Sequence, residues 1–374
     1  MADLVKSVLG GARSLIVGWI LPVFLSLQLV TALVLPELRR ITGVDQFLRQ
    51  TATSRQVALL AIAVVSGLVL AAAQAPLYRI LEGYILWPPK IADRRIKKHQ
   101  DRRREFVKKQ EVATKTDKGV HAGLLYERAA RYPAKDKQFA PTMLGNAIRR
   151  FETYAGDRYQ LDSQLLWHNL TAAAPERALT AVDNARTNVD FFVSLLYGGA
   201  MTALLGFGAI VVGEGTVRAW VAIATGVLIA MVCYRLAVLA TDEWDAAVRG
   251  LIDHGRKGVA AAFGLTVPDD FADERLMWRA VNTLVRRPYT YSESKDVAGI
   301  LNRFRTKDAD KPTPKPATAT AVTLPALPQL VQDAWLAGSS IVVIHPSDAE
   351  HTGQSAREET AREAHRRQSP VDRL

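Results

Sequence analysis

The architecture of this chain follows from residues 57–109, which read VALLAIAVVSGLVLAAAQAPLYRILEGYILWPPKIADRRIKKHQDRRREFVKK. Residues 57–75 carry no charge, which is typical of a helix that crosses the hydrocarbon core of a membrane. Tyr84 and Trp87 follow at the depth where amphipathic aromatic rings prefer the lipid headgroups, and Pro88 and Pro89 interrupt the helix. Residues 90–109 then carry ten Lys and Arg against three acidic residues. This order indicates bilayer core, interface and cytoplasm.

The 374-residue chain has a formal net charge of +11, and its apolar residues are concentrated in four blocks. These blocks predict transmembrane helices at about 14–35, 57–77, 191–213 and 219–240. The connection 37–56 carries four arginines against two acidic residues, whereas about twenty Lys and Arg lie within 82–190. The two connections that flank one span cannot lie on the same side of the membrane. Because the excess of Lys and Arg is larger in 82–190, we place this connection and both termini in the cytoplasm. We therefore expect a multi-pass protein of the plasma membrane.

The predicted fold is an all-α membrane protein with four transmembrane helices, a helical cytoplasmic unit and a flexible tail. Its expected parts are a first transmembrane hairpin (1–81), a cytoplasmic basic helix and helical subdomain (82–190), a second hairpin (191–240), a cytoplasmic helical segment (241–305) and the tail (306–374). Pro22 is expected to bend the first span. Apolar spacing predicts a helix at 273–285, and we expect 241–305 to pack on 120–188. The tail begins with a segment rich in Pro, Thr and Ala, which is typical of a linker.

Small residues recur at four-residue spacing in three of the spans, which makes smooth ridges that let helix backbones approach closely. The ridges consist of Ala63, Gly67 and Ala71 in the second span, Gly198, Thr202 and Gly206 in the third, and Ala222, Gly226 and Ala230 in the fourth. Two interpretations are compatible with this pattern: packing within one four-helix bundle, which we favour, and a seam between copies in a homo-oligomer.

The basic run has a local balance of +7 and forms a candidate surface for anionic lipid headgroups. Each cation held near such a membrane contributes about 1 kcal/mol. The cations are Lys90, Arg94, Arg95, Lys97, Lys98, Arg102, Arg103, Arg104, Lys108 and Lys109. The alternative is that the run only prevents translocation and solvates a helix. A nucleic-acid partner is not expected, because no series of base-stacking aromatic residues accompanies the charge.

Catalytic, cofactor and metal sites are not expected from the sequence. The single cysteine, Cys233, excludes a disulfide or a thiolate cluster within one chain, and no histidine pair has the spacing for one helix face. Asp242, Glu243 and Asp245 are interpreted as a solvated helix face, and Asp269 with Asp270 as a cap for a helix that begins near Phe271. Arg235 lies close enough to the end of its span to reach the interface.

Short sequence patterns provide a resemblance. Residues 78–84 read YRILEGY, residues 141–146 read PTMLGN, residues 157–162 read DRYQLD before Leu166-Trp167, and Glu274-Arg275 precede Trp278. These patterns resemble a group of uncharacterised, largely actinobacterial, multi-pass membrane proteins, in which glycine usually occupies the position of Gln160 and a Pro-Arg pair that of His168 and Asn169. The resemblance covers about the middle two thirds of the chain. It implies architecture and bacterial source but no established activity.

The sequence favours a non-enzymatic membrane anchor or scaffold whose cytoplasmic unit binds a protein partner. The alternative is a small channel or transporter formed by oligomerisation of the four-helix bundle. Polarity inside the spans discriminates between them, and it is low: no acidic residue lies in mid-span, and Gln28 and Gln74 are expected to hydrogen-bond across the bundle.

Overall fold

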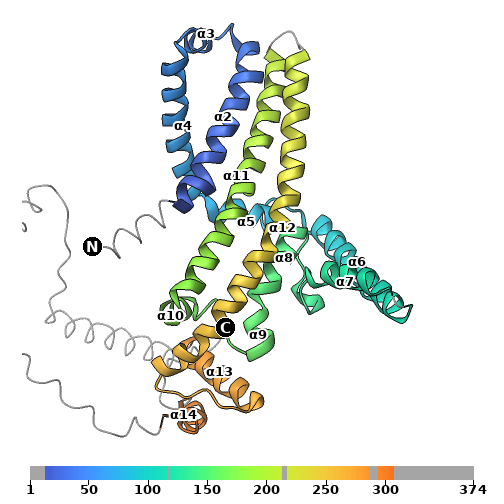
Figure 1. The fold of residues 1–374 in the computed structure, drawn as a ribbon, viewed down its shortest axis with the longest axis vertical. Helices are drawn as coiled ribbons and strands as arrows, with labels where there is room; N and C mark the ends of the chain where they lie inside the picture. The colour runs from blue at the N-terminus through green and yellow to red at the C-terminus, as the bar shows by residue number, and fades with distance from the viewer. Residues whose placement is uncertain (1–12, 117, 213–216, 287–293, 307–374) are drawn as a thin grey trace, which may run out of the picture. The chain divides into compact units, whose positions relative to one another are not determined.

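The computed structural model describes residues 13–116, 118–212, 217–286 and 294–306, which are mostly helical with one isolated bridge between Leu265 and Arg305 (Figure 1). In chain order the elements are η1 (Ile16–Ile20), α2 (Leu21–Leu33), η2 (Leu35–Leu38), α3 (Thr42–Leu48), α4 (Ala52–Ala72), α5 (Gln74–Glu82), α6 (Pro89–Lys115), α7 (Gly119–Ala130), η3 (Asp136–Gln138), α8 (Met143–Glu152), α9 (Tyr154–Tyr159), α10 (Trp167–Ala173), α11 (Glu176–Val212), α12 (Val217–Ala262), α13 (Phe271–Arg286) and α14 (Ser294–Asn302). The predicted tail lies outside the described residues.

Four helices are long and apolar enough to cross a membrane, as predicted: Arg13–Leu33, Ala52–Ala72, Glu176–Val212 and Val217–Ala262. They lie side by side in Figure 1, where α2 contacts α4 and α11, and α11 contacts α12 along its length. Their outer surfaces carry large exposed apolar side chains such as Leu68, Phe207 and Leu228. Such a surface is stable only in an apolar solvent, which the bilayer provides.

The second span differs from its predicted range of 57–77, because α4 begins at Ala52 and ends at Ala72. Ala73 leaves the helical conformation with ψ near 7°, and α5 begins at Gln74. Pro76 provides the reason: it lacks the N–H that would bond to the Ala72 carbonyl, but it is well tolerated in the first turn of a new helix. Helix α4 therefore begins and ends somewhat more than one turn before the predicted range 57–77.

Helix α2 is deformed immediately before Pro22, where a bend was expected. Residues Ile16–Ile20 form a π-helical turn, and the N–H of Leu21 donates to the carbonyl of Ile16, five residues earlier. A proline ring clashes with the carbonyl four residues before it and cannot donate to that carbonyl. The wider turn relieves both problems.

Beyond the spans, α11 and α12 continue as uninterrupted helices and organise an extramembrane unit, which we define as their extensions with α8, α9, α10, α13 and α14. Its core contains the fully buried side chains of Leu144, Leu170, Leu251 and Trp278. Burying each of the leucines contributes about 1.5–3 kcal/mol relative to exposure. Contacts of α8 and α10 with α12, and of α9 with α13, confirm that the two extramembrane segments pack on each other.

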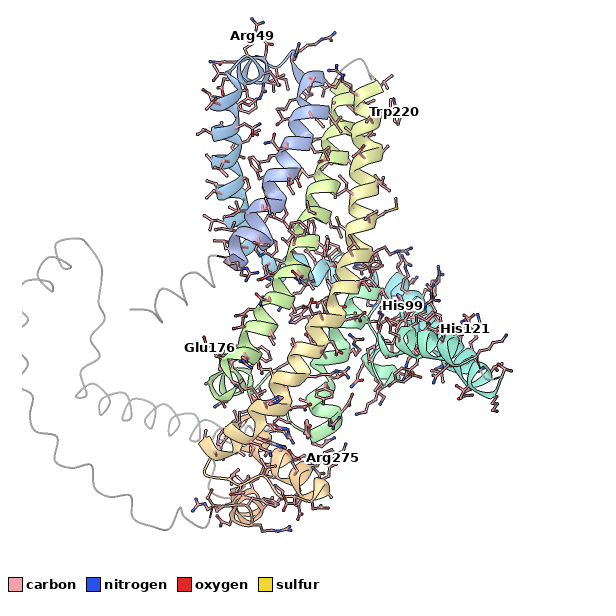
Figure 2. All side chains as sticks on the ribbon, in the orientation of Figure 1. Arg49, His99, His121, Glu176, Trp220 and Arg275 are labelled. Atoms are coloured by element: carbon pink, nitrogen blue, oxygen red, sulfur yellow. The ribbon has the colours of Figure 1, made fainter. Side chains whose placement is uncertain are left out.

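Helices α6 and α7 form an antiparallel hairpin that leaves the bundle to one side (Figure 1). Pro89 occupies the first turn of α6, directly after Pro88, so the chain changes direction at this point. Phe106 and Ala113 of α6 pack against Ala122 and Leu125 of α7. Figure 2 shows His99 and His121 on this hairpin, away from the four long helices.

Candidate functional site

The small-residue ridge of the second span lies against the first span. A Cβ atom placed on Gly67 would lie 2.9 Å from the Cγ1 atom and 3.0 Å from the Cα atom of Ile20. Ala63 is fully buried one turn earlier, and Ala71 is half-buried. Only a glycine allows the two backbones to approach this closely.

The ridges of the third and fourth spans face each other within one chain. A Cβ atom on Gly206 would lie 3.1 Å from the Cβ atom of Ala222, and a Cβ atom on Gly226 would lie 2.5 Å from the carbonyl oxygen of Gly199. The backbone nitrogen of Ala230 lies 3.0 Å from a Cβ atom on Gly199. Gly199 was not part of the predicted ridge, although its carbonyl oxygen is the atom nearest to a Cβ atom on Gly226. Small residues on both helices therefore serve packing inside the bundle.

Two members of the third ridge have other neighbours. Gly198 faces Ser26 of α2, where a Cβ atom would overlap the side chain. Thr202 is fully buried, and its hydroxyl donates to the Gly198 carbonyl at 2.8 Å. Arg235, in contrast, is exposed beside Met231 and Leu236 and points away from the bundle interior.

Four of the ten predicted lipid-binding cations have partners within the chain, and a fifth is half-buried. The guanidinium of Arg95 lies 5.9 Å from the ring centroid of Trp87, and that of Arg102 lies 5.8 Å from the ring of Phe106. Arg104 pairs with Asp136 at 2.7 Å, and Lys109 pairs with Glu105 at 2.6 Å. Arg103 has no ion pair or ring contact among the described residues, but it is half-buried beside a groove that residues of α6, α7, α8 and α9 line.

The other five cations are exposed and, within the described residues, form no ion pair or ring contact: Lys90, Arg94, Lys97, Lys98 and Lys108. At about 3.6 residues per turn they fall on one side of α6, opposite the side that packs on α7. These five cations, which we call the free basic face of α6, have no partner within the described residues.

In the acidic cluster that was expected to be a solvated face, Asp242 and Asp245 instead form an ionic contact between helices, so that interpretation was wrong for these two residues, whereas Glu243 is exposed. Asp245 is only 8% exposed, and its carboxylate lies 2.8 Å from Arg249 and 3.3 Å from Arg150. Asp242 accepts hydrogen bonds from Arg131 at 2.9 Å and from Arg150 at 3.2 Å. The reason is tertiary: α8 and the end of α7 lie on this side of α12.

The cap predicted before Phe271 is confirmed. The backbone N–H groups of Ala272 and Asp273 both donate to the Asp270 carboxylate at 2.9 Å, so one side chain satisfies two unpaired donors at the start of α13.

Asp190 of α11 forms a buried polar centre. It is 2% exposed and accepts hydrogen bonds from Tyr78 at 2.7 Å and from Gln74 at 2.9 Å. Arg186 in turn donates to the Gln74 side-chain oxygen at 3.0 Å. The expectation that Gln74 hydrogen-bonds across the bundle is confirmed. Because every partner comes from α5 or α11, this centre locks α5 onto α11 where the apolar spans end.

The extramembrane unit contains a cavity of about 590 Å³ between α5, α8, α10, α11 and α12. Its wall is apolar and partly aromatic: the lining includes Phe151, Trp167, Trp244, Val248 and Leu251. Polar residues accompany them, and four of these are exposed: Gln164, His168, Asp183 and Arg186. The ring of Trp244 lies 4.8 Å from that of Phe151, and its indole nitrogen is buried and has no hydrogen-bond partner among the described residues.

Two carboxyl groups, Glu82 at the end of α5 and Glu152 at the end of α8, line this cavity. Burial, with repulsion from Glu152, raises the pKa of Glu82 to about 7. Burial also raises the pKa of Glu152. Arg149 is the nearby cation, but its guanidinium donates to the Tyr84 hydroxyl at 2.6 Å. Among the described residues, neither carboxylate has a hydrogen bond or ion pair.

Two of the segments that carry the resemblance, 78–84 and 141–146, pack against each other. Gly83 has φ of +96°, and a Cβ atom there would collide with Pro141. A Cβ atom on Gly145 would lie 2.5 Å from the carbonyl oxygen of Glu82. The Thr142 hydroxyl accepts from the N–H of Gly145 at 2.9 Å and so caps α8. These glycines allow α5 to end directly on the start of α8, which positions Glu82.

Gln160 occupies a position where the backbone favours glycine. Its φ is +60°, in the left-handed region, and it ends α9. Asn282 of α13 donates to the Gln160 carbonyl at 2.7 Å and accepts from the N–H of Asp162 at 3.0 Å. The turn therefore docks α13, and the glycine usual at this position in the resembling group would relieve its strain.

Within the described ranges, no group of three or more His, Cys, Asp and Glu side chains could hold a metal ion. Comparison of the chain with protein-family models, curated proteins and solved structures gives no match. The candidate sites are therefore the free basic face of α6 and the cavity with its two carboxyl groups.

Proposed function

We propose that this chain is a non-enzymatic integral membrane anchor or scaffold whose cytoplasmic helical unit binds a protein partner. The observation that carries the proposal is the α6–α7 hairpin, which exposes large apolar side chains although it stands outside the bundle. Val120 is 84% exposed, Val112 is 62% exposed and Leu124 is 50% exposed. Neighbouring apolar groups that stay in water are typical of interaction sites.

Two further features support a scaffold. Helices α11 and α12 pass from the spans into the extramembrane unit without a break, so a partner bound to the unit would be held at a defined place. The small residues of α11 and α12 pack against each other inside one chain. They are therefore less available for the channel assembly that was considered as the alternative.

The partner contact is tested with a photo-crosslinking amino acid at Leu124 of the full-length protein in its native membrane. The expected result is one discrete adduct that disappears when Val120 is changed to serine. A crosslinker at Arg279, an exposed position on α13, is the matched control and should not give the same adduct. Equal adducts from both positions, or an adduct that is indifferent to Val120, would contradict a docking surface on the hairpin.

We also propose that the free basic face of α6 contacts anionic lipid. A fluorophore that responds to its environment, attached at position 101, should report insertion in nanodiscs with anionic lipid but not in zwitterionic ones, and salt should reverse the signal. Changing Arg94, Lys97 and Lys98 to glutamine should weaken the free energy of association with the anionic surface by about 3 kcal/mol at most, and the fluorescence signal should fall accordingly. The same number of changes at Arg95, Arg102 and Arg104, which have partners within the chain, should matter less. Equal responses in both lipids would leave the run as a topology signal alone.

A further inference from the structure

The cavity between α5, α8, α10, α11 and α12 differs in charge from the chain that surrounds it. The chain as a whole carries +11, yet the cavity lining contains three carboxylates, from Glu82, Glu152 and Asp183, and one guanidinium, from Arg186. Arg186 already has partners, because it donates to Gln74 and lies 3.9 Å from Asp190. Above about pH 7, where Glu82 is ionised, the cavity therefore presents negative charge beside an aromatic wall.

The two glutamates lack the partner that a structural role would provide. Buried or half-buried carboxylates in folded proteins are normally paired or hydrogen-bonded, because leaving one unpaired costs free energy. In the same unit Asp242 and Asp245 follow this rule, since arginines reach both of them. Glu82 and Glu152 instead share a cavity, and Arg149 is committed to Tyr84 at 2.6 Å and stacks on its ring at 5.0 Å.

We propose that this cavity binds an organic cation, namely a compound with an ammonium group and an apolar body. The ammonium group would lie between Glu82 and Glu152, where charge-assisted hydrogen bonds or direct charge attraction compensate both carboxylates. The apolar body would lie on Phe151, Trp167 and Trp244, whose ring faces also attract cations. A cavity of about 590 Å³ has the size of small-molecule sites in general.

Other ligand classes fit the cavity less well. A bare metal ion would make no use of the aromatic wall, and the described residues contain no cluster of three suitable ligands. An organic anion would meet Glu82, Glu152 and Asp183 with only Arg186 and His168 of the lining to attract it. This inference goes beyond the proposed scaffold function, because it concerns a different surface and a different class of partner.

The binding experiment uses the full chain in zwitterionic nanodiscs and benzyltrimethylammonium as the probe. This ion combines an aromatic ring with a quaternary ammonium group and keeps its charge at every pH. Calorimetric titration gives the affinity, and quenching of tryptophan fluorescence reports the cavity, since Trp167 and Trp244 line it. Phenylacetate, an anion of similar size, is the matched ligand control and should show no saturable binding.

The matched variants are the double change Glu82→Gln with Glu152→Gln, and the control Glu243→Gln. Glu243 is exposed on α12, next to Trp244, but does not line the cavity. The double variant should bind the probe at least about tenfold more weakly, equivalent to about 1.4 kcal/mol, and the control should bind as the wild type does. The melting profile of the double variant should show that this variant is folded, because glutamine removes a like-charge repulsion without changing the side-chain size.

The pH dependence gives an independent readout. The charged groups near Glu82 are Arg79 of α5, and Arg149 and Glu152 of α8; the cavity lining adds His168 of α10, and Asp183 and Arg186 of α11. Because a neutral Glu82 cannot attract a cation, affinity for the probe should fall as the pH is lowered from 8 to 6. Absent or unsaturable binding of the probe, equal affinity in the double variant, or equally tight binding of phenylacetate would each overturn the proposal.

Discussion

Changing Gly226 to alanine should destabilise the bundle, because this glycine lies where the backbones of α11 and α12 are closest. The added Cβ atom would lie 2.5 Å from the carbonyl oxygen of Gly199 and 2.6 Å from the backbone nitrogen of Ala203, whereas real Cβ contacts essentially never fall below 3.0 Å. Backbone atoms cannot rotate away as a side chain can. The two helices must therefore separate locally by at least about 0.5 Å, and overpacking of this kind costs about 1–3 kcal/mol.

Gly208 provides the matched control on α11. It also lies inside a membrane-spanning helix, but a Cβ atom there would meet nothing within 4 Å. Alanine at this position should leave stability unchanged or raise it by up to about 1 kcal/mol, since glycine is the less favourable residue in a helix interior. The comparison between the two variants removes the general effect of exchanging glycine for alanine.

The assay is reversible unfolding of the purified protein in increasing sodium dodecyl sulfate, followed by tryptophan fluorescence. A second readout is the rate at which an apolar maleimide labels Cys233, the single thiol, which is buried on α12 two turns after Gly226. The Gly226 variant should unfold at lower detergent fraction and be labelled faster than the Gly208 variant. Indistinguishable unfolding and labelling of the two variants would refute the close contact between α11 and α12.

Three further predictions concern the extramembrane unit and the orientation of the chain. The folded state keeps the Glu82 proton up to about pH 7, whereas the unfolded chain releases it near pH 4.5. Glu82 therefore makes the free energy of unfolding fall as the pH rises through this window. In the variant Glu82→Gln, the melting temperature should depend less on pH between 5 and 7.5. At Gln160, where φ is +60°, glycine should raise the free energy of unfolding by up to about 1–2 kcal/mol, because it removes the clash of the Cβ atom in the left-handed conformation. Valine should lower the melting temperature, because a β-branched residue adopts this conformation least readily. In a cysteine-free background, an impermeant thiol reagent should label a cysteine at Gly43 but not at Lys118 in intact cells; labelling at Lys118 would contradict the orientation.

The interiors of helices could be read from local sequence, whereas some of their ends could not. Asp270 was correctly predicted to cap α13, because a cap involves only a side chain and the next two or three N–H groups. The break at Ala73 was missed, because an unbroken run of uncharged residues hides the point at which Pro76 starts a new helix.

The candidate site was not predictable from these local patterns. Glu82 and Glu152 are 70 positions apart and carry no recognisable motif, and each looks like an ordinary helical glutamate until α5 and α8 meet. The basic run was recognised from composition, but its division into a free face and a set of paired cations depends on contacts with η3 and with Trp87. The acidic cluster on α12 was misread for the same reason, since its arginine partners Arg131 and Arg150 come from α7 and α8.

The sequence by itself determined that four helices could cross a membrane, because the bilayer imposes a length and an apolar composition that any such segment must show locally. Only the tertiary structure decided that Asp190 is bound by Tyr78, 112 positions away, and that two glutamates share a cavity with an aromatic wall. Burial, pairing and pKa depend on distances in space, and in this chain packing brings together groups that are far apart in sequence.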